Sequence, residues 1–351
     1  MQMTQMLGNA DLRRFLKILH CILMSVFKIH HSLQTKNLRK SALPQASASS
    51  AFHHTHMKSQ RKVTYLQALQ GFSRLIRWQN LAIIVFTQYF TRFFLIGGKD
   101  LSFSYLMEII TERKLFYISL ATVLIAASGY IINDYYDIKI DLVNKPERVV
   151  IGRYVKRRWA MIINQIFNGS GILLGLLVSK KVALVNLSAV FCLWLYSNQL
   201  KRLAFWGNLM VAILTGFSLL VLAIYYPGHQ SEVWIYAIFS FFITLIREII
   251  KDMEDVKGDE KHGCKTLPII WGIARTKLLV YVLIASFITT LFILATQLPD
   301  DRVAYIFLIM MLPVGYVTYK LVYADKPRDF AYLSNACKVI MLLGVLTMVF
   351  V

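Results

Sequence analysis

The chain has 351 residues, of which 57% are hydrophobic and 17% charged, and its mean hydropathy is +0.53. A soluble domain carries about 25% charged residues, so this composition excludes an ordinary soluble enzyme. The four cysteines are scattered and form neither a disulfide framework nor a zinc-binding spacing. In so apolar a chain, the formal net charge of +20 suits an anionic membrane face or a phosphorylated substrate.

The N-terminal segment, residues 1–57, differs in composition from the rest of the chain. It contains a basic, partly amphipathic stretch from Asp11 to His31 and then a run rich in Ser, Ala and His. Three interpretations are open: a cytoplasmic tail with an interfacial helix, a targeting segment, or translated sequence upstream of a start at Met57. We expect this segment to be an extension, disordered or outside the mature fold, and residues 58–351 to form the membrane domain.

Apolar stretches of transmembrane length follow along most of the remaining chain. A spanning helix needs roughly 20 mostly apolar residues, and nine stretches approach this length: 81–97, 115–132, 160–179, 182–199, 207–226, 231–250, 277–297, 303–323 and 333–351. Strand alternation is not the dominant pattern, so a helical bundle is favoured over a barrel. The sequence therefore predicts an all-α membrane protein with a bundle of about nine transmembrane helices.

Basic residues in the loops predict the orientation of this bundle. If residues 1–80 are cytoplasmic, nine spans place four loops on the same side: 133–159, 199–206, 251–276 and 324–332. These loops hold 16 Lys and Arg residues, whereas the four opposite loops hold six. The bias favours an inside N-terminus and cytoplasmic active-site loops. Loops that bind substrate phosphates would produce the same asymmetry for a different reason.

Acidic residues gather in two short windows at the cytoplasmic ends of predicted spans. Ten of the 19 Asp and Glu residues lie in residues 133–148 and 248–260. In each window they repeat at helical spacing, because residues three or four apart share one face of a helix. The first face carries Asn133, Asp137 and Asp141, with Asp134 one position away. The second carries Asp252, Asp255 and Asp259, with Glu248 one turn earlier.

Stacked carboxylates at a membrane surface call for a cation between them, since unpaired they would repel and carry a high desolvation cost. Mg²⁺ is the natural candidate, because it takes one or two carboxylates and completes its shell with water and phosphate oxygens. The stripes include no Cys or His, which disfavours zinc and copper. Basic residues such as Lys145, Arg148 and Lys251 lie beside them. Carboxylates for metal and bases for oxyanions together predict a diphosphate site.

Other function classes are compatible with parts of this pattern. A non-catalytic transporter of phosphorylated lipids could use the same charged face, although transporter carboxylates lie towards the bilayer midplane. A CDP-alcohol phosphotransferase also uses aspartates and Mg²⁺, but its Asp-Gly…Ala-Arg…Gly-x-x-x-Asp-x-x-x-Asp pattern is absent. A non-enzymatic scaffold would leave two complete metal faces unexplained. An enzyme is therefore the favoured class.

The two acidic motifs resemble those of a known family. Asn133-Asp134-x-x-Asp137-x-x-x-Asp141 and the later Asp255-x-x-x-Asp259 are similar to the two aspartate-rich motifs of the UbiA superfamily of intramembrane polyprenyl transferases. The resemblance runs from about residue 70 to the end. It implies a nine-helix bundle around a central lipid-accessible cavity, which binds an isoprenyl diphosphate through Mg²⁺ and transfers the prenyl group to a hydrophobic acceptor. No nucleic acid or protein partner is expected.

The resemblance also assigns site residues. It implies metal ligands in both motifs: Asn133, Asp134, Asp137, Asp141, Asp252, Asp255 and Asp259. It implies that Asn133, Lys145, Arg148 and Lys251 bind the substrate. The family's Tyr/Lys motif in the central cytoplasmic loop is similar to Tyr196-Ser-Asn-Gln-Leu-Lys201, although the spacing is five rather than four. Tyr196 and Lys201 are therefore expected to act in catalysis together with Asp134, Asp137, Asp255 and Asp259.

The acceptor is suggested by the branch of the family that the motifs resemble most. The motifs are similar to those of digeranylgeranylglyceryl phosphate synthases and chlorophyll synthases, which implies transfer of a geranylgeranyl group to a geranylgeranylglyceryl phosphate or another lipid. A quinone-type or chlorophyll-type aromatic acceptor is the alternative. One departure is Val149-Val-Ile-Gly152, where relatives commonly carry a Pro-rich run that would shape the loop beside the diphosphate.

Overall fold

The computed structural model describes residues 65–97, 102–144, 146–228, 230–296 and 301–350. Within these ranges the side chains of residues 143, 144, 148, 230, 295, 296 and 301–308 are not described. The chain divides into two units, residues 1–62 and 63–351, and all described residues lie in the second. The expectations for residues 1–57 fall outside the described part.

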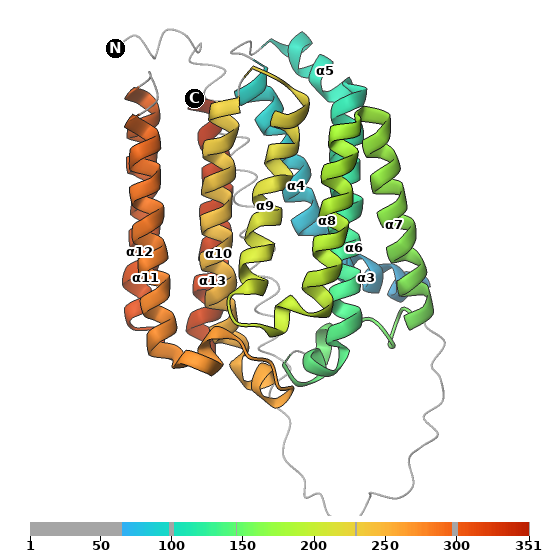
Figure 1. The fold of residues 1–351 in the computed structure, drawn as a ribbon, viewed down its shortest axis with the longest axis vertical. Helices are drawn as coiled ribbons and strands as arrows, with labels where there is room; N and C mark the ends of the chain where they lie inside the picture. Colours follow the sequence, from blue (N-terminus) through green and yellow to red (C-terminus); the bar gives the residue numbers. More distant parts are fainter. Residues whose placement is uncertain (1–64, 98–101, 145, 229, 297–300, 351) are drawn as a thin grey trace, which may run out of the picture. The chain divides into compact units, whose positions relative to one another are not determined.

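Helices account for nearly all of the described chain (Figure 1). In chain order they are α3 (Tyr65–Leu75), α4 (Trp78–Thr91), η1 (Arg92–Ile96), α5 (Phe103–Thr111), α6 (Arg113–Asn144), η2 (Pro146–Arg148), α7 (Arg157–Val178), α8 (Lys180–Asn198), η3 (Leu200–Arg202), α9 (Trp206–Tyr225), α10 (Gln230–Lys261), α11 (Leu267–Thr296), α12 (Asp301–Val322), α13 (Pro327–Leu346) and η4 (Thr347–Phe350). The expected all-α fold is confirmed for these residues.

Seven of the described helices are long and apolar enough to cross a membrane: α6 to α11 and α13, the last with η4. Two of the nine predicted spans are represented less completely. The first coincides with α4, which has 14 residues before it continues as the π-helix η1. The apolar helical part found within α12 is Ile309–Val322. The count of nine therefore stays a prediction.

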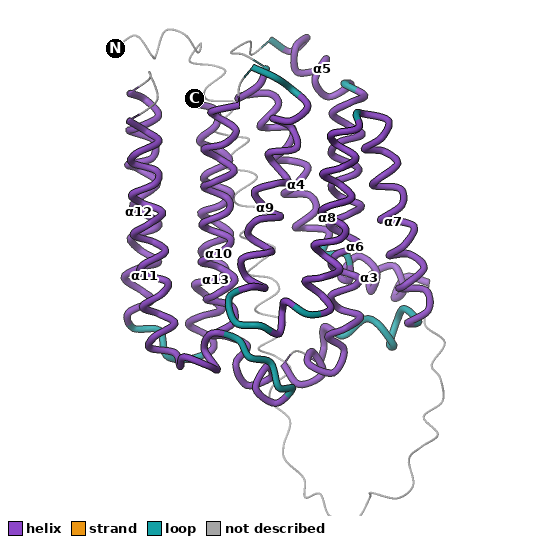
Figure 2. The backbone as a smooth tube through the Cα atoms, viewed as in Figure 1, coloured by secondary structure: helices purple, strands orange, loops and turns teal. Residues whose placement is uncertain are grey.

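Two helices extend well beyond the apolar core. α6 and α10 have 32 residues each, which corresponds to about 48 Å at 1.5 Å per residue. Their C-terminal ends lie at the same end of the helix bundle (Figure 1). The loops that follow α6, α8 and α10 gather there as well (Figure 2). Both acidic motifs are therefore brought to one end of the bundle, which we call the motif end.

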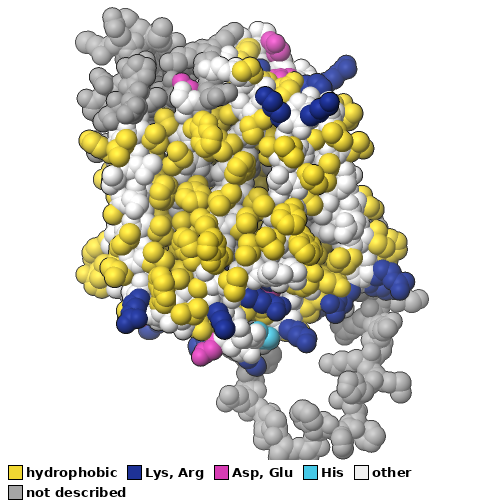
Figure 3. All heavy atoms as spheres, viewed as in Figure 1, with side chains coloured by type: hydrophobic (Ala, Val, Ile, Leu, Met, Phe, Trp, Pro, Cys, Tyr) yellow, Lys and Arg dark blue, Asp and Glu magenta, His cyan; other side chains and the backbone are white. Residues whose placement is uncertain are grey.

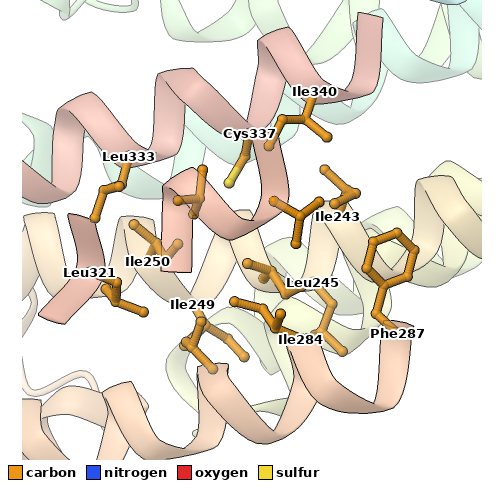
Figure 4. Packing of buried hydrophobic residues seen from close by; sticks show 14 of the residues in the cluster. Ile243, Leu245, Ile249, Ile250, Ile284, Phe287, Leu321, Leu333, Cys337 and Ile340 are labelled. Atoms are coloured by element: carbon orange, nitrogen blue, oxygen red, sulfur yellow. The ribbon is translucent and has the colours of Figure 1, made fainter. Parts of the chain in front are cut away.

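The largest hydrophobic core lies around α10. Ile243, Ile249 and Ile250 of α10 pack with Phe287 of α11 and Leu333 of α13, each at most 2% exposed (Figure 4). Between membrane-spanning helices such contacts stabilise the fold through close van der Waals packing, because lipid tails are as apolar as these side chains. The core holds α10 at a fixed height in the bundle, and with it the second motif.

Small residues let α7 approach α6 and α8 closely. A Cβ at Gly171 would lie 2.6 Å from Ile125 of α6, and a Cβ at Gly175 would lie 3.1 Å from the Ala183 backbone of α8. Asn186 of α8 donates a hydrogen bond to the Gly171 carbonyl. Close backbone approach at small residues is typical of helix pairs in membranes. Hydrophobic side chains cover the middle of the face seen in Figure 3, and Lys and Arg gather at its two ends.

Candidate active site

The first motif occupies the last three turns of α6. Asn133, Asp134, Asp137 and Asp141 are all half-buried. The helix continues through this acidic stretch because its side chains find cationic partners on other elements, as described below. The predicted helical spacing of the motif is therefore present in the structure.

Lys201 contacts the first motif from the loop between α8 and α9. Its Nζ lies 2.6 Å from Asp137 Oδ1 and 3.5 Å from Asn133 Oδ1. The Lys201 side chain is only 8% exposed. Burial lowers the pKa of the Lys201 ammonium, and the Asp137 carboxylate opposes that shift. The ammonium lies 5.7 Å from the centre of the Tyr136 ring, which adds a cation–π contact.

Tyr196, the expected partner of Lys201, lies on the last turns of α8. It lines the central cavity described below and lies within electrostatic range of Asp137, Glu248 and Asp252. The structure thus brings both Tyr196 and Lys201 to the acidic region. The ion pair of Lys201 is with Asp137.

Arg77 neutralises Asp134, the first carboxylate of the first motif. Its guanidinium lies 2.9 Å from Asp134 Oδ1 and 4.8 Å from the centre of the Tyr130 ring. Arg77 precedes α4 with φ 51° and ψ 51°. This left-handed conformation is uncommon for a residue with a side chain and is often found at functional sites. Arg77 was not among the site residues predicted from the sequence. A basic residue placed directly before the first span was the available signal.

The second motif occupies the last turns of α10. Asp252 Oδ2 accepts a hydrogen bond from Asn208 Nδ2 of α9 at 2.8 Å. Asp255 and Asp259 follow on the next two turns and are half-buried. Asn208 was also missed, because a single asparagine in an apolar helix gives no sign of its partner in the sequence.

The two motifs face each other across the motif end. Lys251 of α10 lies within electrostatic range of Asp134 and Asp141 of α6. Burial raises the pKa of the Cys264 thiol, and the carboxylates of Asp259 and Asp137 both act on this thiol and raise its pKa further. A backbone hydrogen bond of 2.9 Å from Lys265 to the Arg202 carbonyl joins the two loops that follow α8 and α10. One polar region therefore contains both motifs.

A central cavity of about 300 Å³ extends from this polar region into the bundle. α4, α6, α8, α9, α10 and α13 all contribute to its lining. Its charged lining residues are Arg77, Arg247, Glu248, Lys251 and Lys338. Farther from the motifs, its lining includes aliphatic side chains such as Ile84, Ile125 and Val221. The cavity can therefore hold a molecule with an anionic head and an apolar chain.

Gln88 of α4 bonds to two residues that line this cavity. Its side-chain nitrogen donates to Thr122 Oγ1 at 3.1 Å and to the Ser218 carbonyl at 2.8 Å. Thr122 and Ser218 both line the cavity, and Gln88 is 1% exposed. This glutamine connects α4, α6 and α9 beside the cavity and was not among the residues predicted from the sequence.

The predicted diphosphate-binding bases of the first loop lie mostly outside the described residues. This holds for Lys145 as a whole and for the Arg148 side chain, whose backbone forms the end of η2. The following segment forms a tight turn in which Gly152, with φ 90°, donates to the Val155 carbonyl at 2.8 Å. Positive φ favours glycine. A turn around Gly152 is thus present where the Pro-rich run of relatives is missing.

The side chains of the two motifs are chemically suitable ligands for a hard divalent cation, because all of them supply carboxylate or amide oxygens. Among the described residues, however, no three His, Cys, Asp or Glu side chains lie close enough together to hold a metal ion. The reason is visible in the ion pairs: Asp134 and Asp137 each direct an oxygen to a base. A metal ion would bind these carboxylates through their second oxygens or in exchange for a basic partner.

Comparisons with known proteins agree with this architecture. Residues 94–338 match the UbiA prenyltransferase family. A digeranylgeranylglyceryl phosphate synthase of Thermococcus gammatolerans is 36% identical over 197 residues, which cover 56% of this chain and 69% of that protein. A solved structure described as a digeranylgeranylglyceryl phosphate synthase in membranes has a TM-score of 0.62 at 22% identity, covering 81% of this chain and 98% of its own.

A second solved structure is that of a UbiA homolog from Archaeoglobus fulgidus bound to GPP and Mg²⁺. Its TM-score is 0.55 at 15% identity, over 80% of this chain and all of its own. At such identities the two structures establish the fold, and the family match confirms the resemblance seen in the aspartate motifs. The chain therefore belongs to the UbiA prenyltransferase family and is an integral, multi-pass membrane enzyme that transfers prenyl groups.

Proposed function

We propose that this chain transfers a geranylgeranyl group from geranylgeranyl diphosphate to geranylgeranylglyceryl phosphate and releases diphosphate. The observation that carries the proposal is the central cavity, which has charged side chains at the motif end and an apolar interior. A prenyl diphosphate has the same polarity along its length. The similarity to digeranylgeranylglyceryl phosphate synthases supports the choice of donor and acceptor.

The two aspartate motifs would hold Mg²⁺ and the donor diphosphate. The ligands would come from the first motif (Asn133, Asp134, Asp137 and Asp141) and the second (Asp252, Asp255 and Asp259). Bound Mg²⁺ would stabilise the charge that develops on the departing diphosphate. Asn133, Lys145, Arg148 and Lys251 would add hydrogen bonds and positive charge to the same group.

The two basic side chains that pair with aspartates of the first motif would also take part in the reaction. Arg77 and Lys201 each donate to one motif carboxylate, so the motif is kept close to neutral before substrate binds. When metal and diphosphate enter, these donors can turn to the diphosphate oxygens. Positively charged donors aimed at a leaving group stabilise the transition state more than the ground state.

The reaction requires the cavity to exclude water from a reactive carbon. The allylic C–O bond breaks with its electron pair on the diphosphate, the acceptor hydroxyl oxygen forms the new C–O bond, and the hydroxyl proton passes to the released diphosphate. The aliphatic lining keeps water from the allylic carbocation. Tyr130 and Tyr196 line the polar end of the cavity, and their rings can stabilise the positive charge.

The motif end would face the cytoplasm. The loops at this end carry most of the loop Lys and Arg residues, as expected from the positive-inside rule. Accessibility labelling of cysteines introduced at Lys257, near the C-terminal end of α10, and at Lys180, the first residue of α8, would test this orientation in sealed vesicles, because the two positions are predicted to face opposite sides.

The direct test is a turnover assay with purified, detergent-solubilised protein. Labelled geranylgeranyl diphosphate and Mg²⁺ are incubated with geranylgeranylglyceryl phosphate, a quinone-type aromatic acid or a chlorophyllide, and EDTA serves as the control. We expect Mg²⁺-dependent prenylated product and diphosphate with the first acceptor. Product with another acceptor would move the chain to a different branch. No diphosphate release with any donor and acceptor would favour transport of phosphorylated lipids.

A further inference from the structure

A group of basic side chains lines the cavity beyond the aspartate motifs. Arg247 and Lys251 of α10 and Lys338 of α13 all line its polar part, together with one carboxylate, Glu248. Arg247 donates to Glu248, and Lys251 Nζ lies 3.8 Å from Glu248 Oε2. We call Arg247, Lys251 and Lys338 the basic cluster.

Among the residues that line the cavity, the basic cluster carries more positive charge than the lining carboxylates balance. Arg77 and Lys201 are matched by Asp134 and Asp137, respectively. Among the described residues that line the cavity, the three cations of the basic cluster share the single carboxylate of Glu248, which leaves an excess of two positive charges. An anion of about two negative charges would balance it.

Arg247 also carries a donor that is not used. Its Nε is buried and has no hydrogen-bond partner among the described residues. Buried donors are normally paired, and each unpaired one calls for an explanation such as a ligand. A guanidinium presents its donors in a fork that matches the oxygens of a phosphate.

Lys338 lies at an unusual place for a charge. It is the twelfth residue of α13, near the middle of a helix long and apolar enough to span the membrane. Within the described part of the chain, it forms no ion pair within 4 Å, and the charged groups that act on it electrostatically include Arg247, Lys251 and Glu248. Ionisable residues inside a membrane are costly and are usually retained for binding or transport.

Arg247 lies deeper in the bundle than the aspartates of the second motif. It precedes Asp252 by five residues and Asp255 by eight on α10, which places it about 8 and 12 Å deeper, respectively, along the helix axis. Lys251 lies between the two levels and is within electrostatic range of Asp134 and Asp141. A diphosphate held by the aspartates would therefore meet Lys251 and leave Arg247 and Lys338 for a second anionic group.

We propose that the basic cluster binds the terminal phosphomonoester of the acceptor and so selects a phosphorylated lipid acceptor over its alcohol. This inference rests on the proposed function for the identity of the acceptor. A phosphomonoester carries about 1.5 to 2 negative charges at pH 7, which matches the charge excess of the cluster. Lys251 would lie between the acceptor phosphate and the donor diphosphate.

The test compares binding of two ligands that differ only in the phosphate. Dissociation constants for geranylgeranylglyceryl phosphate and for the corresponding alcohol are measured by titration calorimetry, without Mg²⁺ and without donor. We expect the wild type to prefer the phosphate, and Lys338→Gln to reduce this preference roughly tenfold, since a charged hydrogen bond is lost. Lys338→Arg should retain it. Lys320→Gln, at an exposed lysine of α12, is the matched control and should behave as wild type.

The possible outcomes test the acceptor-phosphate site independently of whether the protein transfers prenyl groups to this acceptor. An unchanged preference in Lys338→Gln would overturn the inference, even if the wild type is an active synthase. Weaker binding of geranylgeranyl diphosphate in this variant, with acceptor binding unchanged, would overturn it in favour of a donor site. A lost phosphate preference would support the cluster as a phospholipid site, even if no prenyl transfer is found.

Discussion

Lys201 Nζ and Asp137 Oδ1 lie 2.6 Å apart and join the loop between α8 and α9 to the first aspartate motif on α6. The pair is largely shielded, with side-chain exposures of 8% and 15%. Because the Lys201 ammonium is held this close to a motif carboxylate, it can turn towards the departing diphosphate with little movement of the loop. The loop is thus part of the site although it carries no motif carboxylate.

Replacement of Lys201 should therefore impair catalysis more than folding. We expect Lys201→Gln to lower kcat roughly 100-fold, as loss of a single charged donor to a developing anion does in other enzymes. The measurement is steady-state turnover with the thermal midpoint as a folding check. Lys265→Gln is the control, because Lys265 is exposed in the neighbouring loop. A Lys201→Gln enzyme with wild-type kcat would remove Lys201 from the mechanism.

The position of Lys201 depends on the absence of a side chain at Gly207. A Cβ at Gly207 would lie 2.9 Å from Lys201 Cα and 3.0 Å from the Leu200 carbonyl oxygen, both backbone atoms. Gly207→Ala should displace the loop and reduce kcat about 10- to 100-fold, since small misplacements of catalytic groups are costly. Gly169→Ala on α7, where a Cβ meets nothing within 4 Å, should keep full activity. Equal activity of the two variants would contradict this role.

Arg77 should compete with metal for Asp134. In Arg77→Gln, the half-buried Asp134 loses its cation, so the midpoint of thermal unfolding should fall by a few degrees, an effect reduced by the 40% exposure of Arg77. Mg²⁺ should then raise the midpoint more in the variant than in the wild type, because the ion no longer displaces an arginine. Fluorescence-monitored melting with and without Mg²⁺ measures both effects. An equal Mg²⁺ response in the two proteins would show that Arg77 and metal do not share Asp134.

Gln88 should limit the length of the prenyl chain. Gln88→Ala removes the hydrogen-bonded bridge from α4 to Thr122 and Ser218 and deepens the cavity. We expect the ratio of kcat/KM for a donor one isoprene unit longer to that for geranylgeranyl diphosphate to rise about tenfold. Gln199→Ala, at an exposed residue after α8, is the control. If the ratio is unchanged, chain length is set elsewhere in the cavity.

The helical fold and the location of the acidic motifs were predictable because each rests on a local pattern. Apolar stretches of membrane length specify helices without reference to distant residues. Asp134 and Asp137 repeat at helical spacing within a few residues, so their shared region of α6 follows from the sequence. The number of spans was harder to predict, since α4 is short and passes into a π-helical turn.

The partners of the motif carboxylates could not be predicted in the same way. Arg77 lies 57 residues before Asp134, and Asn208 lies 44 residues before Asp252. Each is a single polar residue on another helix or loop, and only the packing of the bundle brings it to the motif. The same holds for Lys201, which the sequence paired with Tyr196 and the structure joins to Asp137.

The central claim is that the two aspartate motifs act as one Mg²⁺-dependent prenyl transfer site. The most direct measurement is the rate of prenylated product and diphosphate formation by Asp137→Asn, Asp255→Asn and the double variant, with Glu260→Gln at an exposed acid of α10 as control. We predict background rates for each single variant and no further loss in the double, because residues that act as a unit are not additive. Wild-type rates in either single variant, with EDTA still abolishing turnover, would contradict the claim.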